Sequence, residues 1–188
     1  MENTLKPQND PENGHFGTGE KLANVACRKA RLPYHGYVNG QETNLEPLIR
    51  PFPRWNVRDA DSAWCAAFVY ACLLDAGFDI PYSPDECVTC SLAGCGGFEE
   101  FALGDERVGY YRADGSFRPA VGDVVIFDSV FQGKEHDHIG IVVGVEKDHL
   151  LTAEGNVPGT NTSGIVKRSL DEHVRSFIRF PDGYRYQR

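Results

Sequence analysis

The sequence predicts an α+β domain in which N-terminal helices pack on a five-stranded antiparallel sheet or a small open barrel. Two observations support this class: apolar residues follow helical spacing before residue 77, and short apolar strands follow one another closely after Pro119. The 188-residue chain is 41% hydrophobic and 24% charged, which suits one globular domain with a single core. We therefore expect residues 1–17 to form a flexible polar tail and residues 18–188 to form one domain.

The first predicted helix covers residues 20–31 and ends at Pro33. Its apolar positions have helical spacing, namely Leu22, Val25, Ala26 and Ala30. Residues 34–58 contain glycines, prolines and scattered aromatics, and we expect a long irregular connection of the kind that tends to carry function.

The second predicted helix is capped by Asp61 or Ser62 and runs to about Ala76, where Gly77 ends it. We expect it to bury one apolar stripe, formed by Phe68, Val69, Cys72 and Leu73. Cys65 stands near the start of this helix, and Cys72 lies deeper in it with an expected structural role.

Strands are predicted in the C-terminal half of the chain. Short helical stretches and glycine-rich turns are expected before them, over residues 79–118. The strands are expected at residues 121–127, 138–145, 150–156, 164–170 and 174–180. Because the connections between them are short, neighbouring strands should pair in antiparallel fashion.

Charge and composition exclude several kinds of partner. The formal net charge of −8 argues against nucleic acid or an anionic membrane surface, because phosphate binding relies on clustered Lys and Arg. There is no run of about 18 apolar residues that could span a membrane. The polar N-terminus lacks the pattern of a secretory signal, so we expect synthesis in the cytoplasm and a reduced state for the six cysteines. We also expect a monomer.

The residues with the best prospects for chemistry are Cys65, His138, Glu154 and Asn156. A thiol in the first turn of a helix is stabilised as thiolate, although a buried cysteine is often only a small hydrophobe. His138 begins one predicted strand, and Glu154 and Asn156 lie two apart on the next, so the imidazole can meet a carboxylate or an amide. A thiol nucleophile needs such a base and such an orienting group.

Other residues offer weaker alternatives. His136 is the nearest competitor of His138 but lies within a polar loop, and Trp64 is expected in the core or lining a substrate groove. Cys87, Cys90 and Cys95 lack a fourth zinc ligand nearby, and Asp59 with Asp61 supplies too few oxygens for calcium. We therefore expect no metal and no cofactor.

Four blocks of sequence, in this order, resemble the CHAP family of cysteine, histidine-dependent amidohydrolases and peptidases. They are Ala63-Trp64-Cys65-Ala66-Ala67-Phe68-Val69, the run from Pro119 to Phe127, Asp137-His138-Ile139-Gly140-Ile141-Val142, and Glu154-Gly155-Asn156. The resemblance covers roughly residues 20–181. It implies a papain-like fold, with the nucleophile on Cys65, the general base on His138, the orienting carboxylate on Glu154 and a site amide on Asn156.

The resemblance further implies a substrate, the peptide part of bacterial peptidoglycan. The bond cut is then either that of an N-acetylmuramoyl-L-alanine amidase or one within the stem or cross-bridge peptide, through an acyl-enzyme. The protein is expected to act on the cell wall after release or export. Two alternatives stay open: a non-catalytic module of the same fold that binds wall peptides, and a thiol amidase with a non-wall substrate.

Overall fold

The computed structural model describes residues 16–32, 34–37, 42–55, 63–171 and 173–188. Within them the helices are α1 (Gly19–Arg31), α2 (Glu46–Ile49), α3 (Cys65–Ala76) and α4 (Cys95–Gly104). The strands are β1 (Gly109–Arg112), β2 (Val124–Phe127), β3 (His138–Val145), β4 (His149–Val157), β5 (Thr162–Ser169) and β6 (Val174–Arg179). No helix in these segments is long and apolar enough to cross a membrane.

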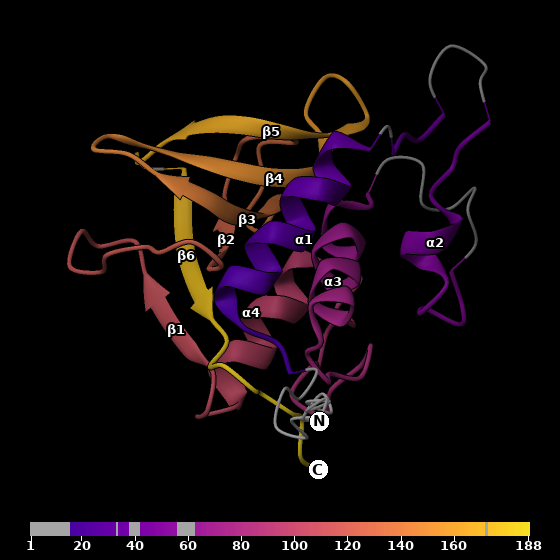
Figure 1. Ribbon diagram of the computed structural model, residues 1–188, viewed down its shortest axis with the longest axis horizontal. Coiled ribbons are helices and arrows are strands. Elements are labelled where there is room, and N and C mark those ends of the chain that lie inside the picture. The colour runs from indigo at the N-terminus through magenta and orange to yellow at the C-terminus, as the bar shows by residue number, and fades with distance from the viewer. Residues whose placement is uncertain (1–15, 33, 38–41, 56–62, 172) are drawn as a thin grey trace, which may run out of the picture.

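The strands form one open antiparallel sheet in the order β1-β6-β2-β3-β4-β5 (Figure 1). The predicted α+β class and antiparallel sheet are confirmed, but the count of five strands is wrong, since the described residues contain six. The additional strand, β1, is only four residues long and pairs with β6, which follows about 65 residues later in the chain. So short a segment has no alternation to recognise before its partner is known.

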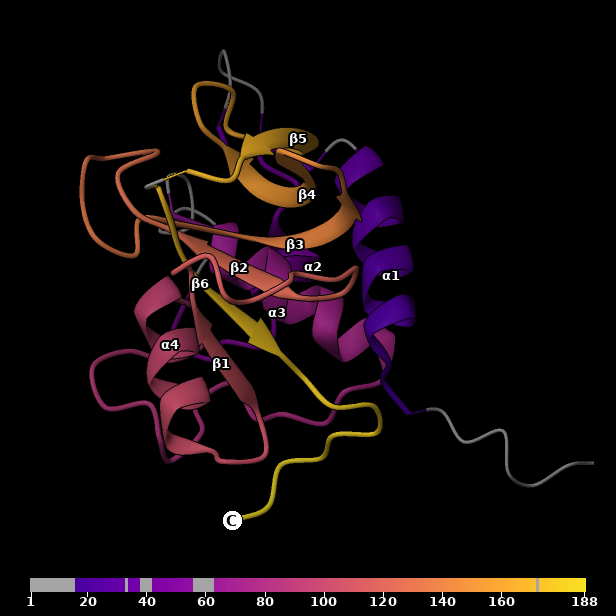
Figure 2. The ribbon, with the colours of Figure 1, turned by 90° about the vertical axis from the view of Figure 1, so that its left-hand side faces the viewer.

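Helix α3 is central, because its residues from Cys65 to Leu73 are all buried (Figure 1). It contacts α1, α2, β3 and β4, so the predicted single apolar stripe is wrong: α3 is covered on several sides. Helix α1 packs on α3 and on β3–β5, whereas α4 lies beside β1, toward the other edge of the sheet (Figure 2). The main core fills the space between these helices and the sheet.

A smaller apolar cluster lies on the opposite face of the sheet. It is formed by Val125, Phe127, Val142, Leu150, Val174 and Phe177. Neighbouring residues Val124 and Ile126 belong to the main core instead, as the alternation of a strand requires. Each face of β2 is therefore buried, which accounts for its unbroken apolar sequence.

The ends of the helices follow local sequence only in part. Helix α1 begins after Thr18, whose side chain accepts the Lys21 N–H at 3.1 Å, and it ends at the predicted residue. Gly77 ends α3 in the left-handed conformation (φ +94°), also as predicted. The predicted cap of α3 is wrong: its N-cap is Trp64, which forms no side-chain cap, and Asp61 and Ser62 lie outside the described residues.

Two further boundaries differ from expectation. The irregular connection over residues 34–58 contains the one-turn helix α2, with a proline in its first turn. Strand β2 starts at Val124 rather than 121, because Gly122 adopts φ +95° in a turn. A Cβ on Gly122 would lie 2.3 Å from the Gly19 carbonyl oxygen, so this turn holds the start of α1 against the sheet.

Of the predicted tail, residues 1–15 lie outside the described residues, and Gly17 is hydrogen bonded to Gly77 and Gly183.

Candidate active site

Cys65 is the first residue of α3 and lies on the wall of a pocket of about 230 Å³. Cys65 is 7% exposed, and the backbone N–H of Ala66 donates a hydrogen bond to the sulfur. The first turn of a helix presents free N–H groups and the positive end of the helix dipole, both of which stabilise a thiolate. The fold therefore places the thiol where ionised sulfur is favoured and where a ligand can reach it.

The start of α3 is fixed by close contact with β4. Gly155 lies against the helix, and a Cβ there would be 2.5 Å from the Cβ of Phe68 and 2.7 Å from Cζ3 of Trp64. Trp64 has no exposed surface, does not line the pocket, and donates its indole N–H to Asn161 at 2.8 Å. Trp64 therefore lies in the core, one of its two expected places, where the indole supports the beginning of the helix.

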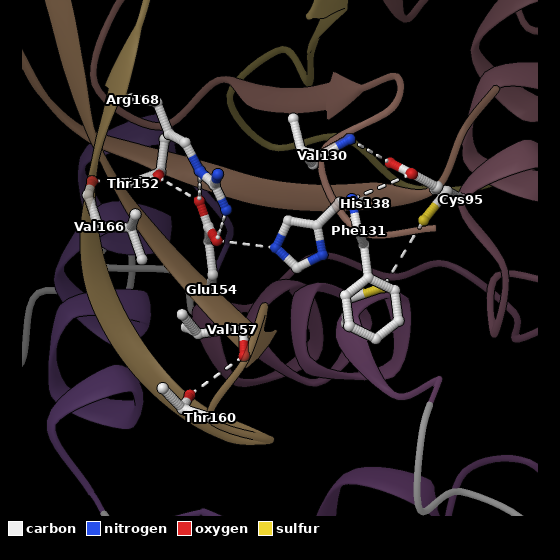
Figure 3. Close-up of polar contacts among 12 residues, drawn as sticks. Cys95, Val130, Phe131, His138, Thr152, Glu154, Val157, Thr160, Val166 and Arg168 are labelled. Atoms are coloured by element: carbon white, nitrogen blue, oxygen red, sulfur yellow. Dashed lines mark hydrogen bonds and ion pairs between the residues drawn. The ribbon is translucent and has the colours of Figure 1, made fainter. Parts of the chain in front are cut away.

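His138 and Glu154 meet across β3 and β4, which pair as the sequence predicts. Nε2 of His138 lies 2.7 Å from Oε2 of Glu154, and both side chains are 0% exposed (Figure 3). Gly140 makes this possible, since a Cβ on it would lie 2.9 Å from Cγ of Glu154. The carboxylate thereby fixes Nε2 as the protonated nitrogen and leaves Nδ1 for another partner.

Two residues that the sequence reasoning missed hold Glu154 in turn. Arg168 on β5 donates from Nε to Oε1 at 2.8 Å and from Nη2 to Oε2 at 2.6 Å, and the Thr152 hydroxyl donates to Oε1 at 2.6 Å (Figure 3). The Arg168 guanidinium also lies over the ring of Phe127, 5.1 Å from its centroid. The signal for Arg168 was its alternation with Gly164, the residue that pairs with Glu154 in the register of β4 and β5.

The charged side chains around Glu154 and His138 shift the pKa values of one another. Burial opposes ionisation of Glu154, but Arg168 and then His138 lower the pKa of its carboxyl to about 2. Burial also opposes the charged form of His138, yet its interactions with Cys65 and Glu154 raise the imidazole pKa to about 9. Nδ1 of His138 is buried without a regular hydrogen bond to the described residues, and Cys65 is one of the two groups whose interaction raises the imidazole pKa.

Cys95 is the second thiol of the site. It is the first residue of α4, and its sulfur lies 3.7 Å from that of Cys65 (Figure 3). The hydrogen bond from Cys95, followed by the interaction with His138, lowers the pKa of Cys65 to about 5 against the effect of burial. The same contact raises the pKa of Cys95, which stays a neutral donor. The shifts of Cys65 and His138 both favour the thiolate–imidazolium form of the pair.

The outer wall of the pocket is the loop between β2 and β3. Asp137 organises this loop by accepting the backbone N–H groups of Val130, Phe131 and Gln132 at 2.8–3.1 Å. Residues of this loop and of the starts of α3 and α4 line the pocket, namely Ala63, Cys65, Ala93, Gly94, Cys95, Phe131, Gln132, Lys134, Glu135, His136, Asp137 and Asn156.

The two remaining candidates, Asn156 and His136, both line the pocket. Asn156 is 2% exposed and lines the pocket together with Cys65, but its positive φ of 52° breaks the strict alternation with Glu154. His136 contacts Glu99, which is paired with Arg175 at 2.9 Å, so its ring is held by a different carboxylate from the one that holds His138. The structure thus brings Cys65, His138, Glu154 and Asn156 to one place.

The predicted metal candidates are placed as follows. The described segments contain no group of three or more His, Cys, Asp or Glu side chains arranged to hold a metal ion. Cys87 donates its thiol to the Gly97 carbonyl at 3.3 Å, and burial raises its pKa to about 12, as befits a structural thiol. Asp59 and Asp61 lie outside the described residues.

Comparison with known proteins identifies the family of this chain. A search of curated proteins found no match. Among solved structures, "The crystal structure of Ly7917" is similar at 16% sequence identity and a TM-score of 0.49, over 88% of this chain and 62% of that chain. The sequence model of the CHAP domain matches residues 57–156, which is more than half of the chain and includes Cys65, His138, Glu154 and Asn156. The chain belongs to the CHAP domain family.

Proposed function

We propose that this protein is a cysteine hydrolase that cleaves amide bonds in bacterial peptidoglycan. The CHAP domain indicates peptidoglycan amidase or peptidase activity in general. The observation that carries the finer assignment is the buried His138, held by Glu154 at 2.7 Å on one nitrogen and facing the Cys65 thiol with the other. Nucleophile, base and orienting group are the parts that thiol-dependent acyl transfer requires.

The first chemical step is attack on a substrate carbonyl. Cys65 is already a thiolate beside the imidazolium of His138, so no proton has to move before the sulfur–carbon bond forms. The developing oxyanion meets the backbone N–H groups at the start of α3, where the helix dipole stabilises negative charge. Asn156 contributes an amide to the same pocket wall.

Proton transfer then completes the cycle. As the carbon–nitrogen bond breaks, His138 gives its proton to the leaving amine, and a Cys65 thioester remains. The neutral imidazole next takes a proton from water, whose oxygen attacks the thioester and releases the acid. Glu154 stays ionised throughout and keeps the imidazole in the required tautomer and orientation, because Arg168 and Thr152 hold its two oxygens.

The substrate is proposed as the peptide part of peptidoglycan, cut either at the N-acetylmuramoyl-L-alanine bond or within the stem or cross-bridge peptide. On this basis the protein acts on the cell wall after release or export. A papain-like arrangement is the fold expected for such an enzyme.

The test is to incubate the purified chain with purified walls and identify the soluble products by mass spectrometry. Muropeptides with new amino and carboxyl ends support the proposal, and the identity of the ends shows which bond is cut. Cys65→Ser should release no such products. Cys72→Ser is its matched control, since Cys72 lies in the same helix, fully buried, with its thiol pKa raised by burial. Retention of wall peptides without cleavage indicates a binding module, and cleavage of other amides alone indicates a thiol amidase of different specificity.

A further inference from the structure

Two thiols meet in the pocket, and the hydrolytic mechanism uses only one of them. The Cys65 and Cys95 sulfurs are 3.7 Å apart, and a disulfide bond of about 2.05 Å requires them to approach by roughly 1.7 Å. Each thiol is carried by the first residue of its helix, so the two helix N-termini point at the same spot. Two of the other cysteines have different partners: Cys87 contacts the Gly97 carbonyl and Cys90 contacts Thr89.

We propose that Cys65 and Cys95 form a peroxide-sensitive thiol pair, in which Cys95 captures oxidised Cys65 as a reversible disulfide. The assignment of a modification site rests on the geometry of the two sulfurs. Its consequence for activity, reversible inactivation of the hydrolase, rests on the function proposed above.

Access and reactivity both favour this pair. The two cysteines line the same pocket of about 230 Å³, ample for a peroxide, since a water molecule takes up about 30 Å³ in the liquid. Thiolate is the form that reacts with peroxides, and the thiol pKa is lowered at Cys65 whereas burial raises it at Cys72 and Cys87. Cys65 is thus the expected first site of oxidation.

The chemistry balances with a peroxide as the oxidant. The Cys65 thiolate attacks one peroxide oxygen, the O–O bond breaks, and the leaving oxygen takes the His138 proton, which gives a sulfenic acid and, from hydrogen peroxide, one water. The Cys95 sulfur then attacks the Cys65 sulfur, and the S–O bond breaks. The departing hydroxide takes the Cys95 proton as a second water, so two thiols have lost two electrons to one peroxide.

Without the second thiol the outcome differs. A sulfenic acid that finds no thiol proceeds to sulfinic and sulfonic acids, which thiol reductants do not reverse. Cys95 therefore determines whether oxidation of Cys65 is recoverable. Cys90 is the natural comparison, because it is exposed and its sulfur would lie 3.0 Å from a Cβ on Gly94, next to Cys95.

The experiment treats the reduced full chain with graded hydrogen peroxide, alkylates the remaining thiols, and maps the cysteines by non-reducing digestion and mass spectrometry. We expect a cross-linked peptide joining Cys65 to Cys95 and a fall in free thiols from six to four, which dithiothreitol restores to six. In Cys95→Ser we expect no cross-link and an irreversible sulfinic acid on Cys65. Cys90→Ser should behave as the wild type.

Other outcomes overturn the proposal: Cys65 over-oxidised in the wild type without a cross-link, or a cross-link between Cys90 and Cys95 instead. Circular dichroism checks that Cys95→Ser is folded, and Cys95→Ala replaces it if it is not. Wall hydrolysis by the oxidised wild type should fall and return with dithiothreitol. Because the cysteine map needs no substrate, a chain inactive on walls when fully reduced argues against the proposed function and leaves the test of the thiol pair intact.

Discussion

Replacement of Arg168 by methionine is expected to destabilise the fold through Glu154. The change keeps much of the side-chain volume but removes the two charged hydrogen bonds, at 2.8 and 2.6 Å, from a carboxylate with 0% exposure. Burial disfavours the carboxylate, yet Arg168 and His138 lower its pKa from 4.5 to about 2, which corresponds to roughly 3 kcal/mol of preference for the ionised form. Breaking a buried ion pair on one side costs about 3–5 kcal/mol, so we expect a loss of about 3 kcal/mol.

The assay is urea unfolding of wild type and Arg168→Met near neutral pH and again in acid. A carboxyl with a lowered folded-state pKa stabilises the fold above its unfolded pKa, and this contribution is lost as the pH falls from about 4.5 toward 2. The difference between the two proteins should therefore shrink in acid. The matched control is Arg50→Met, which removes an exposed ion pair with Glu46 and should change stability little. An Arg168→Met protein as stable as Arg50→Met would refute the reasoning.

Two further predictions concern the helix start and the ion pair. Gly155→Ala should lower the unfolding free energy by about 1–3 kcal/mol and slow catalysis, because the new Cβ forces α3 away from β4. The control in the same urea titration is Gly164→Ala, whose Cβ would have an ordinary 3.5 Å contact, and equal stability of the two variants contradicts the packing argument. The kcat/KM for wall peptides should give a bell-shaped pH profile, which falls below about pH 5 as the Cys65 thiolate is protonated and above about pH 9 as His138 loses its proton. Both limbs belong to the coupled pair, and an acid limb near the ordinary thiol pKa of 9 would show that no such pair forms.

Local patterns in the sequence predicted those parts that depend on local chemistry. The bounds of α1 and β3, the glycine end of α3 and the pairing of β3 with β4 all follow from periodicity, capping and short turns. The meeting of His138 with Glu154 followed from the same pairing, because residues on adjacent strands of a hairpin are neighbours.

What sequence reasoning missed depends on contacts between distant segments. Strand β1 exists because β6 pairs with it, and the start of α3 is set by packing of Trp64 and Gly155 rather than by a capping side chain. Arg168 and Cys95 reach the site from β5 and α4. Cys95 has no marker in its own neighbourhood, and the alternation of Arg168 with Gly164 points to Glu154 only once the register of β4 and β5 is known. Arg168 acts through its charge and Cys95 through a hydrogen bond, and local propensity reports neither.

The most direct measurement is the rate at which wild type and Cys65→Ser release soluble peptides from purified walls at equal concentration. We expect the substitution to reduce the rate by about a thousandfold or more, since the nucleophile acts as a unit with His138 and Glu154. Cys72→Ser should retain the wild-type rate. Equal rates for wild type and Cys65→Ser would contradict the assignment of Cys65 as the nucleophile, and with it the proposed mechanism.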